Sequence, residues 1–427
     1  MNFVGSPGLM KQLNRSAILS LVRERGPLSR SDIARLLNIS PSTVTRIVSQ
    51  LIEEDLLCEE GDVDEQSQPQ PQPQPQPQSH PQSHSLGRRP TLLRFNFLAH
   101  LVIGIDVGGT KTAGSVADLQ GTILYRETVP SKPDGDKSRS LPAMLDFVER
   151  LIDAAPAPRD RVRGIGVGVP SIVLDREGVV VWAPALGWRD TPLRDLIEGR
   201  FGISTFVEND VNLATLGESQ FGVGRGVQNM ACIFVGTGIG GGLILNGELY
   251  RGHEGGAGEV GYIVPRPELL AHSYDDTFGC LEGLAGGPGV VRRVREAIRE
   301  GAPCSGATRL GDGDGDLRGL TAKQVFEAAR EGDALARGIV TETVDYLAEA
   351  VANVACTLNP EMIVLGGGLT RSDDLLLEPI RERVARVVPF MPRIVLAELG
   401  DDAVLRGAIA LAIRATREDI SVQGVAA

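Results

Sequence analysis

Hydrophobic residues recur at helical spacing in three short stretches near the start of the chain, and start and stop signals bound each stretch. Gly26-Pro27 ends the first stretch, because this pair does not continue a helix. Ser29 precedes Asp32 by three residues, which is the spacing of a capping box at the start of a second helix. Ser40-Pro41 supplies an N-cap and a first-turn proline for a third helix. The residues predicted to point inward are Ile18, Leu19, Leu21 and Val22 in the first helix, Ile33, Leu36 and Leu37 in the second, and Val44, Ile47, Val48, Leu51 and Ile52 in the third.

The opposite face of the predicted third helix carries side chains that can read DNA. Hydroxyl, amide and guanidinium groups reach phosphates and base edges in a major groove. These candidate DNA-binding residues are Ser42, Thr43, Thr45, Arg46 and Gln50. The three helices predict a helix-turn-helix, and the alternative interpretation is a small helical module that binds protein.

A β-wing is predicted after the third helix, with a first strand over residues 56–59 and a second over 91–95. An insert of about residues 62–86 separates them, and it contains a Gln-Pro repeat from 68 to 78. Alternating proline cannot join a helix or a sheet, so we expect an extended polyproline-like linker or disorder there. Arg88 and Arg89, held between a glycine and a proline, resemble an AT-hook core that can enter a minor groove. The sequence thus predicts a winged helix-turn-helix DNA-binding domain over residues 9–97.

Charge is distributed unevenly along the chain. The net charge is −12, which would repel DNA if it were spread evenly. Residues 1–52 nevertheless contain seven Lys or Arg and two acids, so this stretch carries +5. This local charge favours a nucleic-acid partner for the N-terminal domain.

The remaining composition is typical of a globular protein in the cytoplasm. Residues 1–20 lack the charged-then-apolar pattern of a signal peptide, and no apolar run approaches the roughly 18 residues of a membrane helix. The five cysteines are scattered without a C-x-x-C pair, which argues against a disulfide framework and a thiolate metal site. We therefore expect no membrane partner.

From residue 101 onward, apolar strands alternate with glycine turns and helices. A strand over 101–105 ends in Asp106, and a glycine turn connects it to a strand over 112–118. A second unit has strands over 231–235 and 243–245 with a glycine turn over 236–242 between them. Two such units are what a duplicated nucleotide-clamping fold requires. The candidate phosphate- or nucleotide-binding residues are Asp106, Gly108, Gly109, Thr110, Lys111, Gly236, Thr237, Gly238, Gly366 and Gly367.

The rest of the body repeats this alternation. Residues 162–169 are predicted to form a strand, and residues 334–358 a long amphipathic helix that feeds a strand over 362–365. The glycines that follow this strand would let an adenosine approach closely. A last helix is predicted over 402–416, with Leu405, Ala408, Ile409 and Ile413 on its buried face.

These features resemble the ROK family of repressors, open reading frames and sugar kinases, which belongs to the actin/hexokinase-like superfamily. Residues 251–261 are similar to its sugar-binding signature, and residues 208–210 and 279–282 match two further motifs. Residues 9–97 resemble the DNA-binding domain of its repressor branch. The resemblance implies an α/β fold: a winged helix-turn-helix followed, over 101–416, by two ribonuclease-H-like lobes of the ATPase type with a ligand cleft between them.

The same resemblance implies a sugar site. Asp210 would be the general base of a kinase, accepting a proton from the attacking hydroxyl. The implied sugar-binding residues are Asn209, Asp210, Glu259, Tyr262 and Glu282. The alternatives are that Asn209 or Asp210 merely caps a helix and that Glu259 and Glu282 are solvated surface acids.

The chain departs from the family at its zinc site. Family members have His at the position of Tyr262, and cysteines at the positions of Ser273 and Asp275. A single thiolate at Cys280 does not make a closed tetrahedral site, so we predict no zinc and no other metal site. The acidic loop over 312–316 resembles the start of a calcium loop but lacks the later glycine and acid, and we interpret it as a flexible polar loop.

Two functions follow from this combination. The first is a sugar-responsive DNA-binding regulator that acts as a repressor and needs no cofactor. It would bind a double-stranded DNA operator and a monosaccharide or sugar-derivative effector, and would form a homodimer or homotetramer. The second is an active sugar kinase that uses ATP and Mg²⁺ and also carries a DNA-binding domain. Fusion to the winged helix and loss of the His-zinc element favour the first function, while the retained Asp106 and Asp210 leave enzyme activity open.

Overall fold

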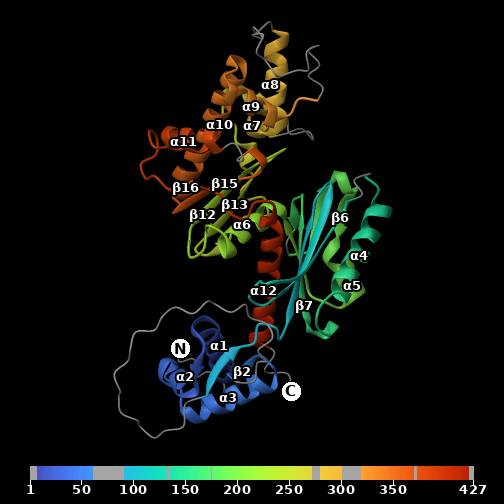
Figure 1. Ribbon diagram of the computed structural model, residues 1–427, viewed down its shortest axis with the longest axis vertical. Helices are drawn as coiled ribbons and strands as arrows, with labels where there is room; N and C mark the ends of the chain where they lie inside the picture. Colours follow the sequence, from blue (N-terminus) through green and yellow to red (C-terminus); the bar gives the residue numbers. More distant parts are fainter. Residues whose placement is uncertain are drawn as a thin grey trace, which may run out of the picture. The chain divides into compact units, whose positions relative to one another are not determined.

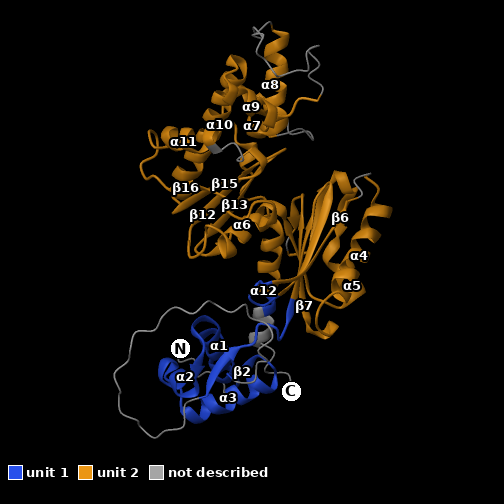
Figure 2. Cartoon of the chain, in the orientation of Figure 1, with its two compact units in different colours: residues 1–101, 118–122, 414–427 blue, residues 102–117, 123–413 orange. Residues whose placement is uncertain are grey.

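The structure of the chain is a computed structural model (Figure 1), and it describes residues 7–60, 91–131, 135–174, 176–271, 279–300, 319–369 and 373–422. The chain forms two compact units (Figure 2). The first unit contains residues 1–101, 118–122 and 414–427, and the second contains residues 102–117 and 123–413. Among the described helices, none is long and apolar enough to cross a membrane.

The first unit is a winged helix-turn-helix. Its helices are α1 (Pro7–Arg25), α2 (Arg30–Leu37) and α3 (Pro41–Glu53). Its antiparallel sheet has the order β1 (Leu28–Ser29), β3 (Leu92–Phe95), β2 (Leu57–Glu59). The three predicted helices and both wing strands are confirmed. The sequence did not predict β1, because two residues are too few to display an alternating pattern.

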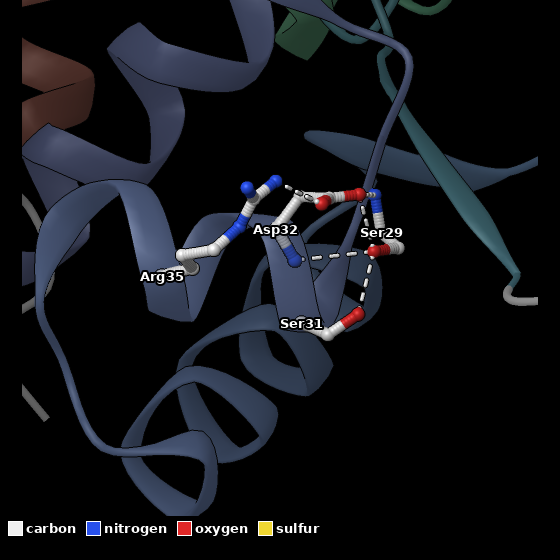
Figure 3. A network of polar contacts seen from close by, with 4 residues as sticks. All are labelled: Ser29, Ser31, Asp32 and Arg35. Carbon is white, nitrogen blue, oxygen red and sulfur yellow. Dashed lines mark hydrogen bonds and ion pairs between the residues drawn. The ribbon is translucent and has the colours of Figure 1, made fainter.

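The predicted helix starts are confirmed in atomic detail. The Ser29 hydroxyl accepts a hydrogen bond from the Asp32 N–H at 3.1 Å, and the Asp32 carboxylate accepts one from the Ser29 N–H, which completes the capping box (Figure 3). The Ser40 hydroxyl accepts from the Thr43 N–H at 3.3 Å, and Pro41 is the first residue of α3. Asn38 takes the left-handed conformation that turns the chain between the two helices.

One prediction for the first core is wrong. Leu36 is 45% exposed, whereas Ile33 and Ala34 are the buried residues of α2. At about 100° per residue the buried face is centred between Ile33 and Ala34, which leaves Leu36 about 110° away from that centre. The remaining predicted core positions are buried or half-buried, with Leu21, Leu37 and Ile52 in the second group.

The second unit is built on two five-stranded mixed sheets. The first has the order β11 (Thr205–Asn209), β7 (Val162–Val169), β4 (Leu101–Val107), β5 (Lys111–Asp118), β6 (Ile123–Pro130). The second has the order β14 (Glu248–Leu249), β13 (Ile239–Leu245), β12 (Met230–Val235), β15 (Met362–Gly366), β16 (Arg393–Leu396). A small sheet of β10 (Trp188–Pro192), β9 (Val179–Ala183) and β8 (Val173–Leu174) accompanies them. The predicted strand over 162–169 is confirmed with the same bounds.

Helices complete the second unit. They are α4 (Lys137–Asp153), α5 (Leu193–Phe201), α6 (Asp210–Phe221), α7 (Cys280–Ala285), α8 (Gly287–Arg299), α9 (Ala322–Glu331), α10 (Ala334–Leu358), α11 (Asp373–Val384) and α12 (Ala403–Val422). The bounds of α10 agree with the prediction, and α12 begins one residue later and ends six residues later than expected. The apolar residues predicted for the last helix are all buried.

The predicted glycine turn over 236–242 is too long. The turn contains only residues 236–238, and Gly240 to Gly242 lie within β13. A Cβ on Gly240 would come within 2.7 Å of the Val211 side chain, and one on Gly242 within 2.2 Å of the Thr215 hydroxyl. These glycines therefore allow α6 to pack directly against β13, which is a tertiary requirement and not a turn signal.

Helix α6 approaches α12 as closely as it approaches β13. A Cβ on Gly407 would lie 1.8 Å from the Leu213 carbonyl oxygen, and one on Gly217 would lie 2.4 Å from the Ala403 carbonyl oxygen. Leu213, Leu216 and Ala408 form a buried apolar cluster at this crossing. The glycines bring the two helix backbones together, and no larger residue fits.

We predict that Gly407→Ala destabilises the second unit by about 1–3 kcal/mol or more, because the added methyl group overlaps helix backbone that cannot yield. The matched control is Gly338→Ala in α10, where an added Cβ meets no atom within 4 Å. That control should raise the free energy of unfolding by about 0.4–1 kcal/mol, since alanine favours a helix more than glycine does. Urea unfolding followed by circular dichroism measures both effects, and equal stability of the two variants would contradict the prediction.

Candidate functional site

A cavity of about 440 Å³ in the second unit gathers many of the predicted site residues. Its walls come from the ends of β7 and β11, the turn between β12 and β13, and the segments that carry the signature acids. The predicted residues that line it are Asn209, Asp210, Gly236, Thr237, Gly238, Glu259, Glu282 and Gly367. Pro170, Ser171 and Ile172 also line it and were not predicted, although they directly follow the predicted strand over 162–169.

Asn209 and Asp210 open α6 at the wall of this cavity. The Asn209 side-chain oxygen accepts from the Asn212 N–H at 3.0 Å, and its amide nitrogen donates to the Ser171 carbonyl at 3.2 Å. The Asp210 carboxylate accepts from the Val211 N–H at 2.9 Å. The capping role therefore applies to Asn209, and it coexists with a place in the cavity wall. These bonds fix both side chains at the start of the helix.

A partly buried ion pair connects the residue before Asn209 to the signature segment. Glu208, whose side chain is only 3% exposed, pairs with Arg251 and also accepts from the Asn212 side-chain amide at 3.0 Å. Arg251 is the first residue of the predicted sugar signature. The sequence placed Glu208 in a family motif without a role, because a pair separated by 43 residues has no local signal.

Glu282 is held against the glycine turn. Its carboxylate accepts from the Ile239 N–H at 2.7 Å, and a Cβ on Gly238 would come within 2.5 Å of the same carboxylate. The turn between β12 and β13 therefore needs glycine where Glu282 enters. Glu259 also lines the cavity, and part of its side chain is exposed to solvent.

The carboxyl groups around the cavity bind protons more tightly than usual. Burial raises the pKa of Asp210 to about 7, and the charges of Asp106 and Glu259 add to the rise. Burial raises the pKa of Asp106 to about 6, and Lys111 partly opposes this rise. Burial also raises the pKa values of Glu259 and Glu282, and the charge of Glu282 adds to the rise at Glu259. Such groups accept hydrogen bonds from hydroxyls, and an acid with a pKa near 7 can take up a proton near neutral pH.

Some predicted residues do not line this cavity. The Gly108 N–H donates to the Lys111 carbonyl at 2.9 Å, so the segment from Gly108 to Lys111 closes a tight turn between β4 and β5. Neither this turn, Asp106 nor Gly366 is part of the cavity wall. Tyr262 ends a 3₁₀ helix (Val260–Tyr262), is 43% exposed and also lies outside the wall.

A second cavity, of about 710 Å³, adjoins the first and shares Gly236 and Thr237 with it. Residues from α8, α9 and the segment after β15 form its other walls. The Gly287 N–H donates to the Gly236 carbonyl at 2.8 Å, and Gly367 has a φ of +90° with no space for a Cβ beside Val235. Gly236 and Thr237 are among the predicted nucleotide-binding residues. The walls from α8 and α9 were not predicted, although the glycine-proline run over 286–289 was a usable signal.

The predicted DNA-reading face of the first unit is largely open. Ser42, Thr45 and Arg46 are exposed, and Thr43 and Gln50 are half-buried. The Thr45 hydroxyl donates to the Pro41 carbonyl at 2.9 Å, and the Thr43 hydroxyl bonds the Ser40 hydroxyl at 2.8 Å. Arg46 makes no hydrogen bond or ion pair within the part of the chain that the structure describes. Arg88, Arg89 and the Gln-Pro insert lie outside that part.

The positive charge of the first unit is smaller than its first 52 residues indicate. Residues 53–60 contain five acids, which cancel the +5 of residues 1–52. Several arginines are paired with acids of the same unit. These pairs are Arg15 with Glu54, Arg30 with Glu59, Arg35 with Asp32, and Arg94 with Glu60. General attraction to DNA is therefore weak, and specific contacts matter more.

The predictions about zinc and calcium concern segments that the structure describes only in part. Ser273, Asp275 and the acidic loop over 312–316 lie outside the described residues. Within the described ranges, no group of three or more His, Cys, Asp or Glu side chains is arranged to hold a metal ion. The Cys280 thiol instead donates to the Leu269 carbonyl at 3.7 Å.

Comparison with known proteins places these observations in a family. The family model described as "ROK family" matches residues 102–415, and a model described as "Winged helix-turn-helix DNA-binding" matches residues 13–57. The chain belongs to the ROK family. Its fold is a winged helix-turn-helix followed by an actin/hexokinase-like domain, as the sequence predicted.

Relatives of this ROK chain include both regulators and kinases. It is 28% identical to a xylose repressor of Caldicellulosiruptor bescii, over 96% of this chain and 98% of the relative. A crystal structure of a ROK family transcriptional regulator, a homologue of the E. coli MLC protein, matches with a TM-score of 0.76 at 23% identity, over 97% of this chain and 98% of that one. A ROK family glucokinase from Streptomyces griseus, solved with glucose and AMPPNP, matches with a TM-score of 0.59 at 33% identity, over 74% and 99%.

We predict that Asp210→Asn stabilises the protein at pH 8 and much less at pH 4. The folded pKa of Asp210 is about 7 against an ordinary value of 3.8, so the folded chain binds this proton more tightly than the unfolded chain. The contribution of Asp210 to the free energy of unfolding is therefore fully present below about pH 4, and it is lost as the pH rises towards 7. The gain at pH 8 should be about 2–4 kcal/mol in urea unfolding. The exposed Asp153→Asn is the control, and a gain that did not change with pH would contradict the prediction.

Proposed function

We propose that this chain is a sugar-responsive DNA-binding transcriptional regulator, a repressor, whose kinase-like domain binds the effector. The observation that carries the proposal is the union in one chain of an open recognition helix and a carboxylate-lined cavity of about 440 Å³. The full-length similarity to a xylose repressor supports it. In this proposal residues 9–97 bind DNA and residues 101–416 bind the effector.

The chemistry of the cavity favours a neutral, hydroxyl-rich ligand. Asp210, Glu259, Glu282 and the Asn209 amide offer acceptors for vicinal hydroxyls, while their combined charge repels anions. A relative at 33% identity was solved with glucose, which agrees with a monosaccharide or a sugar derivative as the effector. Tyr262 would contact such a ligand only if the segment that carries it moved towards the cavity.

The DNA partner would be a double-stranded operator with two-fold symmetry. A single neutral winged helix offers few phosphate contacts, and pairing two of them about an axis supplies more. A homodimer or homotetramer in the cytoplasm satisfies this requirement. Regulation of this kind needs neither zinc nor a bound nucleotide.

The second candidate function is an ATP-dependent sugar kinase. Asp210, with a pKa of about 7, suits the general base of phosphoryl transfer, and the second cavity adjoins the first through Gly236 and Thr237. The relative solved with glucose and AMPPNP favours this reading. Gly236, Thr237 and Gly367 would hold the nucleotide, which with Mg²⁺ supplies the phosphoryl group. ADP production with a panel of aldoses and amino sugars distinguishes the two functions, and Asp210→Asn should abolish any such activity.

We predict that Arg46→Ala, Thr43→Ala and the double variant Arg88→Ala/Arg89→Ala each weaken binding to the DNA upstream of the chain's own gene. Loss of one base or groove contact should cost about 1–3 kcal/mol, or roughly 5- to 150-fold in affinity. Mobility shift measures it, and Arg225→Ala, an exposed arginine of the second unit, is the matched control. Unchanged affinity in all three variants would remove the DNA-reading function.

We also predict that Glu259→Ala and Glu282→Ala abolish the effect of the sugar on DNA binding and leave unliganded binding intact. Effector and operator are coupled only if the sugar makes different contacts in two states of the domain. A thermal-shift screen over monosaccharides identifies the sugar, because a ligand of the folded state raises the melting temperature. Glu254→Ala, in the signature segment but outside the cavity wall, is the control. A full sugar response in the double glutamate variant would place the site elsewhere.

A further inference from the structure

The first unit contains a groove that shares only Thr45 with the predicted base-reading positions of α3. It lies between α2 and the start of α3 and has a volume of about 410 Å³. Arg30, Ser31 and Arg35 line it on the α2 side, and Thr45 lines it on the α3 side. Thr45 also belongs to the predicted DNA-reading face, so the groove is continuous with that face.

Both arginines of the groove are held by carboxylates of the same unit. Arg30 pairs with Glu59 of β2 at 2.8 Å, and Arg35 pairs with Asp32 of α2 at 2.8 Å. Figure 3 shows the Arg35 guanidinium turned back to the Asp32 carboxylate, which also completes the α2 capping box. All four side chains are at least 30% exposed, and exposed pairs of this kind contribute only about 0–1 kcal/mol each. Another anion can therefore replace the carboxylates.

We propose that this groove is a contact surface for the phosphodiester backbone of DNA. Glu59 and Asp32 limit the affinity of the groove for DNA, because they pair with the arginines that would bind the phosphates. The proposal rests on the DNA-binding function proposed above. A guanidinium pairs with a phosphate through two parallel hydrogen bonds, as it does with a carboxylate, so phosphate is the matched competitor. When a phosphate takes Arg30, the released Glu59 carboxylate stays nearby and repels it.

Because the first unit has little net charge, these local ion pairs determine how strongly it attracts DNA. Residues 1–60 have no net formal charge, so the unit attracts DNA through particular guanidinium groups and not through its overall field. Asp32 cannot be changed cleanly, because it also caps α2. Glu59 has no such second role: it is on a wing strand and its side chain contacts Arg30. Glu59 is therefore the informative position.

The test uses the full chain and a fluorescently labelled random-sequence DNA duplex, because backbone contacts do not depend on sequence. Fluorescence anisotropy gives the dissociation constant at several salt concentrations. Glu59→Gln should bind about 3- to 10-fold more tightly than the natural chain at low salt, since it removes one competing carboxylate. Glu24→Gln is the matched control: Glu24 is also an exposed acid of the first unit beside an arginine, Arg23, but it is outside the groove. It should change affinity less than about twofold, because removing the Glu24 carboxylate releases no arginine of the groove and exposed charges contribute little individually.

A double-mutant cycle shows whether Glu59 acts through Arg30. Arg30→Gln should weaken DNA binding. Adding Glu59→Gln to this variant should restore little or no affinity, because the Arg30 guanidinium with which Glu59 competes for DNA is already absent. Circular dichroism melting confirms that each variant is folded. This pattern would support the proposal.

Four results would overturn it. Equal gains from Glu59→Gln and Glu24→Gln, or a gain that persists without Arg30, would mean that only general charge matters, with the DNA-binding function intact. A Glu59→Gln effect on polyglutamate binding but not on duplex binding would assign the groove to an acidic protein segment. Failure of the natural chain to bind either this duplex or its own upstream DNA would overturn the DNA-binding function together with the groove.

Discussion

The close approach of α6 to its neighbours is the constraint on which the second unit depends. Glycines on β13 and α12, Gly242 and Gly407 among them, remove the side chains that would keep α6 away. Because α6 begins at Asp210, the depth at which the helix packs also sets the position of the Asn209 amide and the Asp210 carboxylate in the cavity wall. The same close packing of α6 therefore stabilises the core and positions the site residues. A methyl group added at residue 407, which does not line the cavity, would disturb both.

Carboxylates have opposite uses in the two units. In the second unit, burial makes ionisation costly, so the pKa is about 7 for Asp210 in the cavity wall and about 6 for Asp106 outside it. The raised pKa of Asp210 suits hydrogen bonding to a hydroxyl-rich ligand. In the winged helix, the acids are exposed and paired, and they neutralise arginines that DNA would otherwise attract. Solvent exposure accounts for the difference, since water screens the second set and not the first.

The family assignment leaves a choice between regulator and kinase because the shared fold serves both. The glycine turn over 236–238 joins two adjacent cavities, an arrangement that is compatible with a sugar next to a nucleotide. A fold of this kind does not decide function by itself. What separates this chain from the kinases it resembles is the attached winged helix, with its capped third helix and an Arg46 that has no partner among the described residues.

The sequence by itself determined the features that depend on neighbouring residues. The caps at Ser29 and Ser40 and the bounds of α10 follow from backbone hydrogen bonding and helical periodicity over a few residues. Tertiary structure alone decided that Leu36 is exposed, that Gly240 to Gly242 lie in a strand, and that Arg30 meets Glu59. It also decided the pKa of Asp210, because that value depends on burial. These properties depend on which distant segments come together. The neighbouring sequence does not determine how deeply a residue is buried or which distant residues it contacts.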